Sequence, residues 1–189
     1  MLGTTMTKML NGIEMEAIKA MLRFANLQRI ESVAEAERCF ENIKDFISSD
    51  EAMWRLLKLT VWQIAVCAWL ASITESQRER RAVMTEVAPL VKKSVKTALV
   101  FKNEELGYEC RFQSVHAVCA FAVALILSKR RRLASRLQRC ICGRFNLDLH
   151  PKGRPKKYCS PKHKALADAM TLNERVRKSQ LKHKMGKKS

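Results

Sequence analysis

The main clue to the architecture is an apolar stretch in the first half of the chain, which reads VWQIAVCAWLASI over residues 61–73 and is interrupted by Gln63. A second stretch, VHAVCAFAVALIL over residues 115–127, is interrupted by His116. Both are shorter than the roughly 20 residues that a helix needs to cross a bilayer. We therefore interpret both as buried helices of a protein core and expect no membrane insertion.

The residues around these stretches have the spacing of amphipathic helices, because apolar side chains recur every three or four positions. Pro89 should kink or break the helix in which it lies, since proline removes a backbone donor and clashes with the preceding turn. The segment Lys102–Tyr108 is interpreted as a loop. The sequence thus predicts a mainly α protein whose body, residues 1–128, is a helical bundle. The helices are expected at 7–24, 32–47 and 50–73, at 75–88 with a continuation to 101, and at 114–137.

Three tryptophans, Trp54, Trp62 and Trp69, are spaced at eight and seven residues along one stripe of the central helix. We interpret them as a core or docking stripe and expect the body to form a homodimer or to contact a protein partner. His116, on an apolar helix face, is interpreted as a core histidine with satisfied hydrogen bonds. The sequence has no phosphate-binding glycine loop, no G-x-S-x-G and no H-E-x-x-H motif, so we expect no enzymatic activity.

The positive charge of the chain is concentrated in its last third. The 189 residues carry a formal net charge of +18. Residues 1–128 contain 16 Lys/Arg and 15 Asp/Glu, a net of +1, whereas residues 129–189 contain 20 Lys/Arg and 3 Asp/Glu, a net of +17. Such an excess indicates a polyanionic partner. Nucleic acid, DNA more than RNA, is the favoured partner, and an anionic membrane surface is the alternative.

The cysteines and the start of the chain bear on the cellular compartment. There are seven cysteines, an odd number, and no export signal is recognised at the N-terminus. We therefore expect a cytoplasmic location and no disulfide framework.

Four candidate metal ligands lie in the basic region, where residues 140–163 read CICGRFNLDLHPKGRPKKYCSPKH. Cys140 and Cys142 form a Cys-x-Cys pair, and after sixteen intervening residues Cys159 and His163 form a Cys-x3-His pair. Three thiolates and one imidazole are a common closed ligand set for a single structural Zn²⁺. His150 is a fifth candidate that could replace His163.

The residues around the second pair predict how it is presented. Ser160 is a good helix N-cap and Pro161 suits the first helical position, so Cys159 should precede a helix and His163 should lie in its first turn. This helix is expected to run to about residue 181, with Leu166, Met170 and Val176 facing inward.

The first pair and the segment between the pairs carry further expectations. Gly143 permits a positive φ beside the first pair. A hairpin between the pairs should turn at 152–154, and Phe145 and Tyr158 should form a small apolar core next to the metal.

This C-terminal sequence resembles the treble-clef zinc fingers of the CGNR type and related short bacterial fingers of the form C-G-x-x-F … R-x-Y-C-S-x-x-C. The resemblance covers about residues 136–177, and its most specific parts are Cys142-Gly143 and Tyr158-Cys159-Ser160. This sequence differs from the family pattern in three ways. Only one residue separates its first two cysteines, His163 stands where the family has a cysteine, and the Cys-Gly-Asn-Arg signature itself is absent. The resemblance implies a treble-clef-like zinc finger, made of a β-hairpin and a helix, in a DNA-binding transcriptional regulator.

We therefore divide the chain into the helical body (1–128), a basic zinc-finger module (129–181) and a Lys-rich disordered tail (182–189). The expected function is zinc-dependent nucleic-acid binding, with transcription regulation implied by the resemblance. The alternatives are a non-enzymatic subunit of a nucleoprotein or DNA/RNA-processing complex that clamps nucleic acid non-specifically and, less favoured, an enzyme such as a nuclease. The cations expected to contact nucleic acid are Lys129, Arg130, Arg131, Arg132, Arg136, Arg139, Arg144, Lys152, Arg154, Lys156, Lys157, Lys162, Lys164, Arg175, Arg177 and Lys178.

Overall fold

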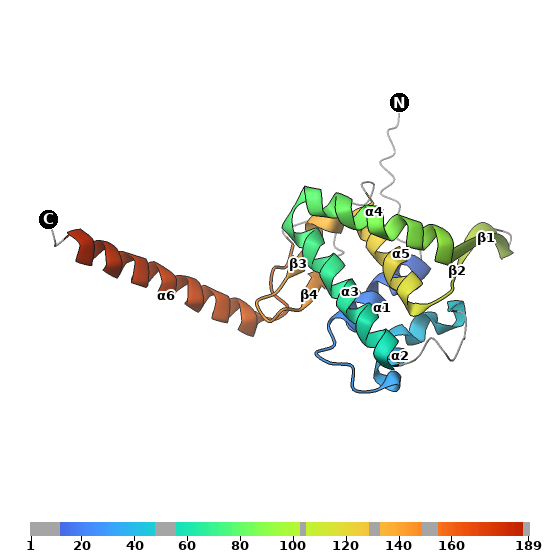
Figure 1. Cartoon of the computed structure of the whole chain (residues 1–189), viewed down its shortest axis with the longest axis horizontal. Coiled ribbons are helices and arrows are strands. Elements are labelled where there is room, and N and C mark those ends of the chain that lie inside the picture. Colours follow the sequence, from blue (N-terminus) through green and yellow to red (C-terminus); the bar gives the residue numbers. More distant parts are fainter. Residues whose placement is uncertain (1–11, 48–55, 103–104, 129–132, 149–154, 187–189) are drawn as a thin grey trace, which may run out of the picture.

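The computed structural model describes residues 12–47, 56–102, 105–128, 133–148 and 155–186. Within these ranges six α-helices are accompanied by two separate antiparallel sheets of two strands each, so the mainly α fold class is confirmed. Five of the helices lie together in the body, and the sixth extends away from it (Figure 1). The body helices are α1 (Gly12–Ala25), α2 (Val33–Phe40), α3 (Leu56–Glu75), α4 (Gln77–Ser94) and α5 (Val115–Leu127).

The helix predicted over residues 32–47 is divided into two elements. It consists of α2 and a 3-10 helix, η1 (Glu41–Phe46). Ser32 caps α2, because its hydroxyl accepts a hydrogen bond of 3.3 Å from the amide of Glu35. The starts predicted for the helices at 7 and 50 lie outside the described residues, and α1 and α3 end two residues or fewer beyond the ends predicted for them.

Pro89, predicted to kink or break its helix, does not break it, since α4 continues through Pro89 to Ser94. An interior proline costs a helix about 3 kcal/mol. Val83 and Val87, which precede Pro89 by six and two residues, are buried in the core. We attribute the continuity of α4 to this packing against the neighbouring helices, which helical spacing within α4 cannot reveal.

The helix continuation to residue 101 and the loop at Lys102–Tyr108 are also wrong. The chain forms a β-hairpin here, with strand β1 (Val95–Lys102) antiparallel to β2 (Glu105–Phe112). The pairing begins at Val95 opposite Phe112. Phe112 and Cys110 are fully buried, so the base of the hairpin is fixed by the core of the body. The β-branched residues at the start of β1 favour a strand locally, but the decisive pairing is with residues that lie further along the chain.

The last helix of the body is shorter than predicted. α5 ends at Leu127, and the segment 129–132 lies outside the described residues. From Leu133 the backbone forms the 3-10 turn η3 (Leu133–Arg136) and then strand β3 (Leu137–Arg139), rather than a helix to residue 137. Leu133 and Leu137 are both buried in the core of the body, and this burial replaces the predicted helical course.

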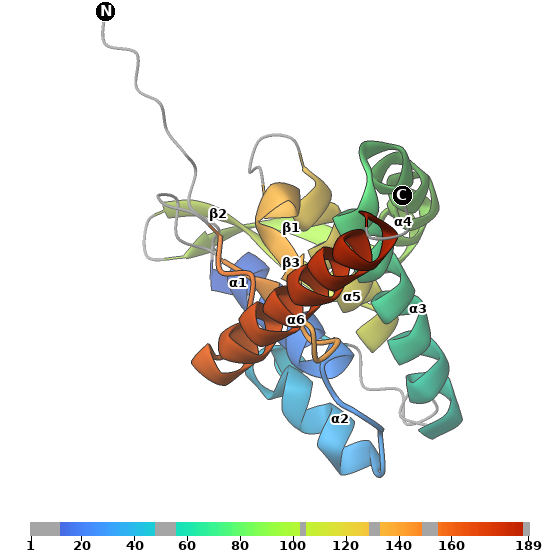
Figure 2. The ribbon, with the colours of Figure 1, turned by 90° about the vertical axis from the view of Figure 1, so that its left-hand side faces the viewer.

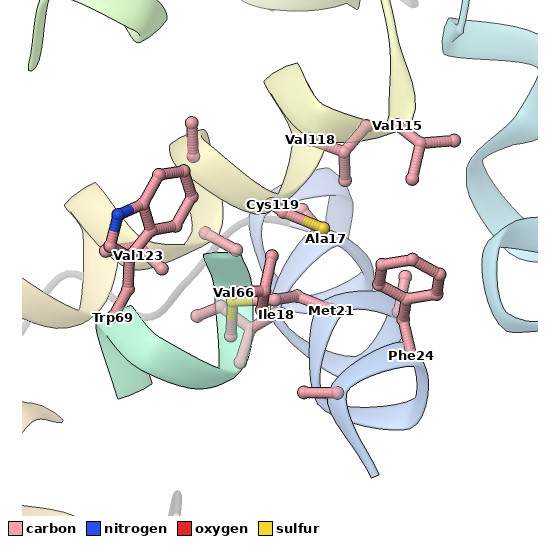
Figure 3. Packing of buried hydrophobic residues seen from close by; sticks show 14 of the residues in the cluster. Ala17, Ile18, Met21, Phe24, Val66, Trp69, Val115, Val118, Cys119 and Val123 are labelled. Atoms are coloured by element: carbon pink, nitrogen blue, oxygen red, sulfur yellow. The ribbon is translucent and has the colours of Figure 1, made fainter. Parts of the chain in front are cut away.

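The core lies where α1, α3 and α5 meet (Figure 3). Ile18, Met21 and Phe24 of α1 are fully buried there, and they pack with Val66 of α3 and Val118 of α5. The two apolar stretches thus form helices that contribute to the core, as predicted, the first in α3 and the second in α5. α5 is buried on nearly every side, as its apolar composition suggests, whereas α3 buries one face and leaves Val61 and Ile64 exposed on the other. No helix in the described part of the chain combines the length and the apolarity needed to span a bilayer.

Gln63, which interrupts the first apolar stretch, is almost completely buried and has a structural role. Its side-chain amide donates hydrogen bonds to the carbonyl oxygens of Phe24 and Leu27, at 3.0 and 2.9 Å. The Cys67 thiol, one turn further along α3, donates to the carbonyl of Ala25 at 3.4 Å. The last carbonyls of a helix have no partner within it. Two side chains of α3 thus complete the C-terminal end of α1.

Helix α6 (Pro161–Gly186) projects from the body (Figure 1) and makes no extensive contact with another described element. In Figure 2, which is viewed from that side, α6 lies in front of the body. Its 26 residues correspond to about 39 Å of helix. The predicted inward stripe is wrong, because Leu166, Met170 and Val176 are 53%, 60% and 48% exposed. Their spacing is helical, but no other element lies close enough to cover them. The backbone also remains helical to Gly186, and so includes the first five residues of the predicted tail.

Candidate metal centre

The first pair of candidate ligands lies on a tight turn between two short strands. β3 pairs with β4 (Phe145–Leu147) in a hairpin whose turn contains the first pair. The amide of Cys140 donates to the carbonyl of Arg144 at 2.8 Å, and the amide of Gly143 donates to the carbonyl of Cys140 at 2.9 Å. Gly143 has φ +85°, the conformation that favours glycine, as predicted. Residues 152–154 lie outside the described residues.

The second pair is presented by the start of α6, as the sequence predicts. α6 begins at Pro161, and the Ser160 hydroxyl accepts a hydrogen bond of 3.2 Å from the amide of His163. Cys159 therefore directly precedes the cap, and His163 lies in the first turn. The positive end of the helix dipole points toward Cys159, which favours the thiolate form that a metal requires.

The structure brings these two pairs together. One ligand atom from each of Cys140, Cys142, Cys159 and His163 lies within 4.8 Å of all the others. The sulfurs of Cys142 and Cys159 are 3.6 Å apart. Two thiolates of a tetrahedral Zn²⁺ site with Zn–S bonds of about 2.3 Å would be about 3.8 Å apart. The donor set and the spacing of its atoms therefore fit a tetrahedral metal ion. Among the described residues, this is the one cluster in which three or more His, Cys, Asp or Glu side chains could hold a metal ion.

The imidazole of His163 is oriented toward the sulfurs through one particular nitrogen. Its Nδ1 is 2.8 Å from the sulfur of Cys159, so Nδ1 is the atom placed to bind a metal. His150, the fifth candidate ligand, lies outside the described residues.

The thiols in this cluster have pKa values that differ in direction. Burial would raise the pKa of Cys140, but hydrogen bonds from the backbone amides of Cys142 and Cys159 outweigh it and lower that pKa to about 6. The pKa of Cys159 is raised to about 11 by burial and by hydrogen bonds with the sulfurs of Cys142 and Cys140. Three thiolates this close would repel one another, so protons are retained on part of the set. A divalent cation would neutralise this repulsion and release those protons.

The hairpin that carries the first pair is attached to the body through Asn26, which follows α1. The Asn26 side chain accepts a hydrogen bond of 2.7 Å from the amide of Phe145 and donates one of 2.9 Å to the carbonyl of Phe145. The Phe145 ring is 5% exposed and belongs to the core of the body, not to a separate core next to the metal. The guanidinium of Arg139 covers this ring at 5.7 Å from its centroid.

The other predicted member of the small metal-side core, Tyr158, is half-buried beside Lys157, whose ammonium is 5.7 Å from the centre of its ring. No sequence pattern indicates the role of Asn26, because its partner lies 119 residues away.

The candidate nucleic-acid contacts have four different placements. Arg136 is not available as a free cation, since it forms a half-buried ion pair of 3.2 Å with Asp148 and also donates to the Asp148 carbonyl. Lys178 lies on α6, but its side chain is not described. The residues outside the described ranges are Lys129, Arg130, Arg131, Arg132, Lys152 and Arg154. The exposed ones are Arg139, Arg144, Lys156, Lys157, Lys162, Lys164, Arg175 and Arg177.

Two tryptophans of the stripe on α3 contact His116 of α5. The imidazole stacks on Trp62 and on Trp69, with ring centroids 5.8 and 5.3 Å away and interplanar angles of 7° and 17°. Its Nε2 is buried and has no hydrogen-bond partner among the described residues, so the expectation of a satisfied histidine is wrong. Burial lowers the pKa of His116, and the carboxylate of Glu86 opposes this effect. Trp54 lies outside the described residues.

Comparisons of this chain with protein-family models, with curated proteins and with solved structures find no match.

Proposed function

We propose that this protein is a non-enzymatic, zinc-dependent nucleic-acid-binding protein, with duplex DNA as the favoured partner and transcription regulation as its role. The observation that carries the proposal is the position of α6. This helix leaves the body directly at the four candidate metal ligands. Of its side chains that are described, at residues 161–177, all but His163 and Ala167 are exposed. Residues 161–186 contain seven Lys/Arg and two Asp/Glu. A projecting helix of this charge is suited to the backbone and grooves of a duplex.

The cations near the ligand cluster support the same partner. Arg144 and Arg139 are exposed on or beside the turn of the hairpin, and Lys156 and Lys157 are exposed just before Cys159. Contacts between such cations and phosphates provide affinity without reading the base sequence. They therefore suit a non-specific clamp as well as a regulator, and the measurements below separate the two.

The proposal excludes catalysis because four protein ligands would fill a tetrahedral metal ion and leave no position for a substrate or an activated water. A cytoplasmic location is part of the proposal, and it is supported by the seven cysteines, which are all free thiols.

The test is the binding of a fluorescently labelled 20-base-pair duplex to the full chain, measured by anisotropy over a range of salt concentrations. We expect the logarithm of the binding constant to fall linearly with the logarithm of salt concentration, with a slope of about −0.9 for each phosphate contacted. The double variant Arg175→Gln/Arg177→Gln should reduce that slope by up to about 1.8. The matched control is Arg29→Gln/Arg38→Gln, which removes the same charge from exposed positions on the body.

Absence of binding at 50 mM salt, or an equal loss in the control variant, would overturn the proposal. Competition with unlabelled duplexes of differing sequence and with RNA then separates the two functions. A regulator discriminates among sequences by orders of magnitude, whereas a clamp shows the same salt dependence with no preference.

A further inference from the structure

A cavity lies away from the metal cluster, between the start of α4 and the end of α5. Its volume is about 450 Å³, within the range of roughly 300–1,000 Å³ typical of small-molecule sites. One wall is a single face of α4, formed by residues at spacings of three and four. The opposite wall is the end of α5 together with η3. The lining residues are Gln77, Arg80, Arg81, Met84, Leu127, Ser128, Ala134 and Ser135.

Among the described residues that line this cavity, the charged groups are two guanidiniums, and none is a carboxylate. Within the described ranges, neither Arg80 nor Arg81 forms an ion pair with an acidic residue. Arg80 is held in place because its Nε donates a hydrogen bond of 2.8 Å to the carbonyl of Ile73, at the end of α3. A guanidinium fixed through Nε retains its terminal nitrogens for a ligand and loses little further freedom on binding.

The remaining lining residues are of two kinds. Met84, Leu127 and Ala134 form an apolar part, and Ser128 and Ser135 place hydroxyl-bearing residues beside it. A few polar groups that converge beside apolar side chains are the usual composition of a small-molecule site.

We infer that this cavity binds a small organic phosphate, that is, a phosphate monoester carried on an apolar or aromatic body. Two guanidiniums balance the charge of about −1.5 to −2 that a phosphate monoester carries near neutral pH, whereas a carboxylate would leave one positive charge uncompensated. Arginine also offers the paired, planar donors that match phosphate oxygens. The apolar residues provide the surface for the rest of the molecule.

The position of the cavity connects it to the finger. η3 leads directly into β3, and β3 ends one residue before Cys140. A ligand in the cavity would contact both α4 of the body and the turn that leads to the first metal ligands, and so would stabilise their present arrangement.

Isothermal titration calorimetry of the full chain with phenyl phosphate tests this inference. Phenyl phosphate combines an aromatic ring with a phosphate monoester, and inorganic phosphate and phenol supply the two halves separately. We expect phenyl phosphate to bind at least tenfold more tightly than either half. Arg81→Ala should weaken that binding at least tenfold. Arg81 is exposed, so this variant should fold, which circular dichroism and the urea midpoint would verify.

The matched control is Arg78→Ala. Arg78 is also exposed in the first turns of α4, but it does not line the cavity, and its replacement should leave the affinity for phenyl phosphate unchanged. Three results would each overturn the inference: no heat of binding up to millimolar phenyl phosphate, an equal affinity for inorganic phosphate, or an equal loss in the two variants. None of them bears on duplex binding, because that proposal rests on α6 and the metal cluster.

Discussion

Replacing Asn26 by alanine tests whether the finger hairpin and the helical body unfold as one unit. The Asn26 side chain joins the end of α1 to β4 through two hydrogen bonds with the backbone of Phe145. The variant removes both at once and leaves the amide and the carbonyl of Phe145 without these partners. It changes no metal ligand, so any effect on the metal must be transmitted through the hairpin.

The expected loss follows from these two groups. A backbone donor or acceptor that loses its partner in a buried position costs about 1–3 kcal/mol. Asn26 is half-buried, so water can partly replace the lost partners, and the lower part of this range applies to each group. We expect the free energy of unfolding to fall by about 2–3 kcal/mol, which corresponds to a roughly 30- to 150-fold change in the unfolding equilibrium.

The measurement is urea unfolding followed by circular dichroism at 222 nm, with the zinc affinity of each protein measured in parallel by competition with a chelator. Asn42→Ala is the matched control, because Asn42 is exposed and its side-chain amide donates one hydrogen bond of 2.8 Å to another side chain, that of Glu16. We expect that variant to lose less than about 0.5 kcal/mol. Asn26→Ala should also lower the zinc affinity, since the hairpin carries Cys140 and Cys142. The reasoning is refuted if Asn26→Ala shifts the urea midpoint no more than Asn42→Ala does.

Three further predictions concern the metal, the end of α1 and the buried histidine. In elemental analysis, we expect Cys159→Ala to contain no zinc and Cys67→Ala to contain one zinc per chain. Equal zinc in the two proteins would refute the ligand assignment. Gln63→Ala should lower the free energy of unfolding by about 1–3 kcal/mol, because the Leu27 carbonyl loses its donor and the Phe24 carbonyl keeps only the amide of Leu27; a loss below 1 kcal/mol in urea unfolding would contradict this. Burial lowers the pKa of His116, so near pH 6 the unfolded chain binds more protons than the folded one, and stability should fall as the pH is lowered from 7 to 5. His116→Phe should reduce this dependence of the urea midpoint on pH, and an unchanged dependence would show that other groups cause it.

The candidate metal centre was largely predictable because its geometry is local within each pair. A glycine that adopts positive φ follows Cys142, and a serine cap followed by proline starts the helix that presents Cys159 and His163. These are short-range preferences of individual residues, and they hold in the structure. The hairpin was predicted between the pairs, but the described hairpin surrounds the first pair, because Leu137 and Phe145 are drawn into the core of the body.

The errors in the fold arise where distant contacts override local pattern. Spacing alone suggested a helix over residues 95–101, yet this segment pairs with β2, whose buried Cys110 and Phe112 fix the register. Pro89 is a strong local signal for a helix end, yet α4 remains continuous around buried Val83 and Val87. In both cases burial against other elements outweighs the local preference.

The sequence by itself determined the helical class, the two core helices, the separation of charge and the identity of four clustered candidate ligands. Each of these depends on composition or on spacing within a short segment, which one chain reveals directly. The tertiary structure alone decided that Gln63 and Cys67 complete the end of α1 and that Asn26 joins this end to the finger hairpin. It also decided that this hairpin shares the core of the body and that Arg80 and Arg81 line one cavity. These features join residues from distant parts of the chain, and a linear sequence contains no local signal for such pairs.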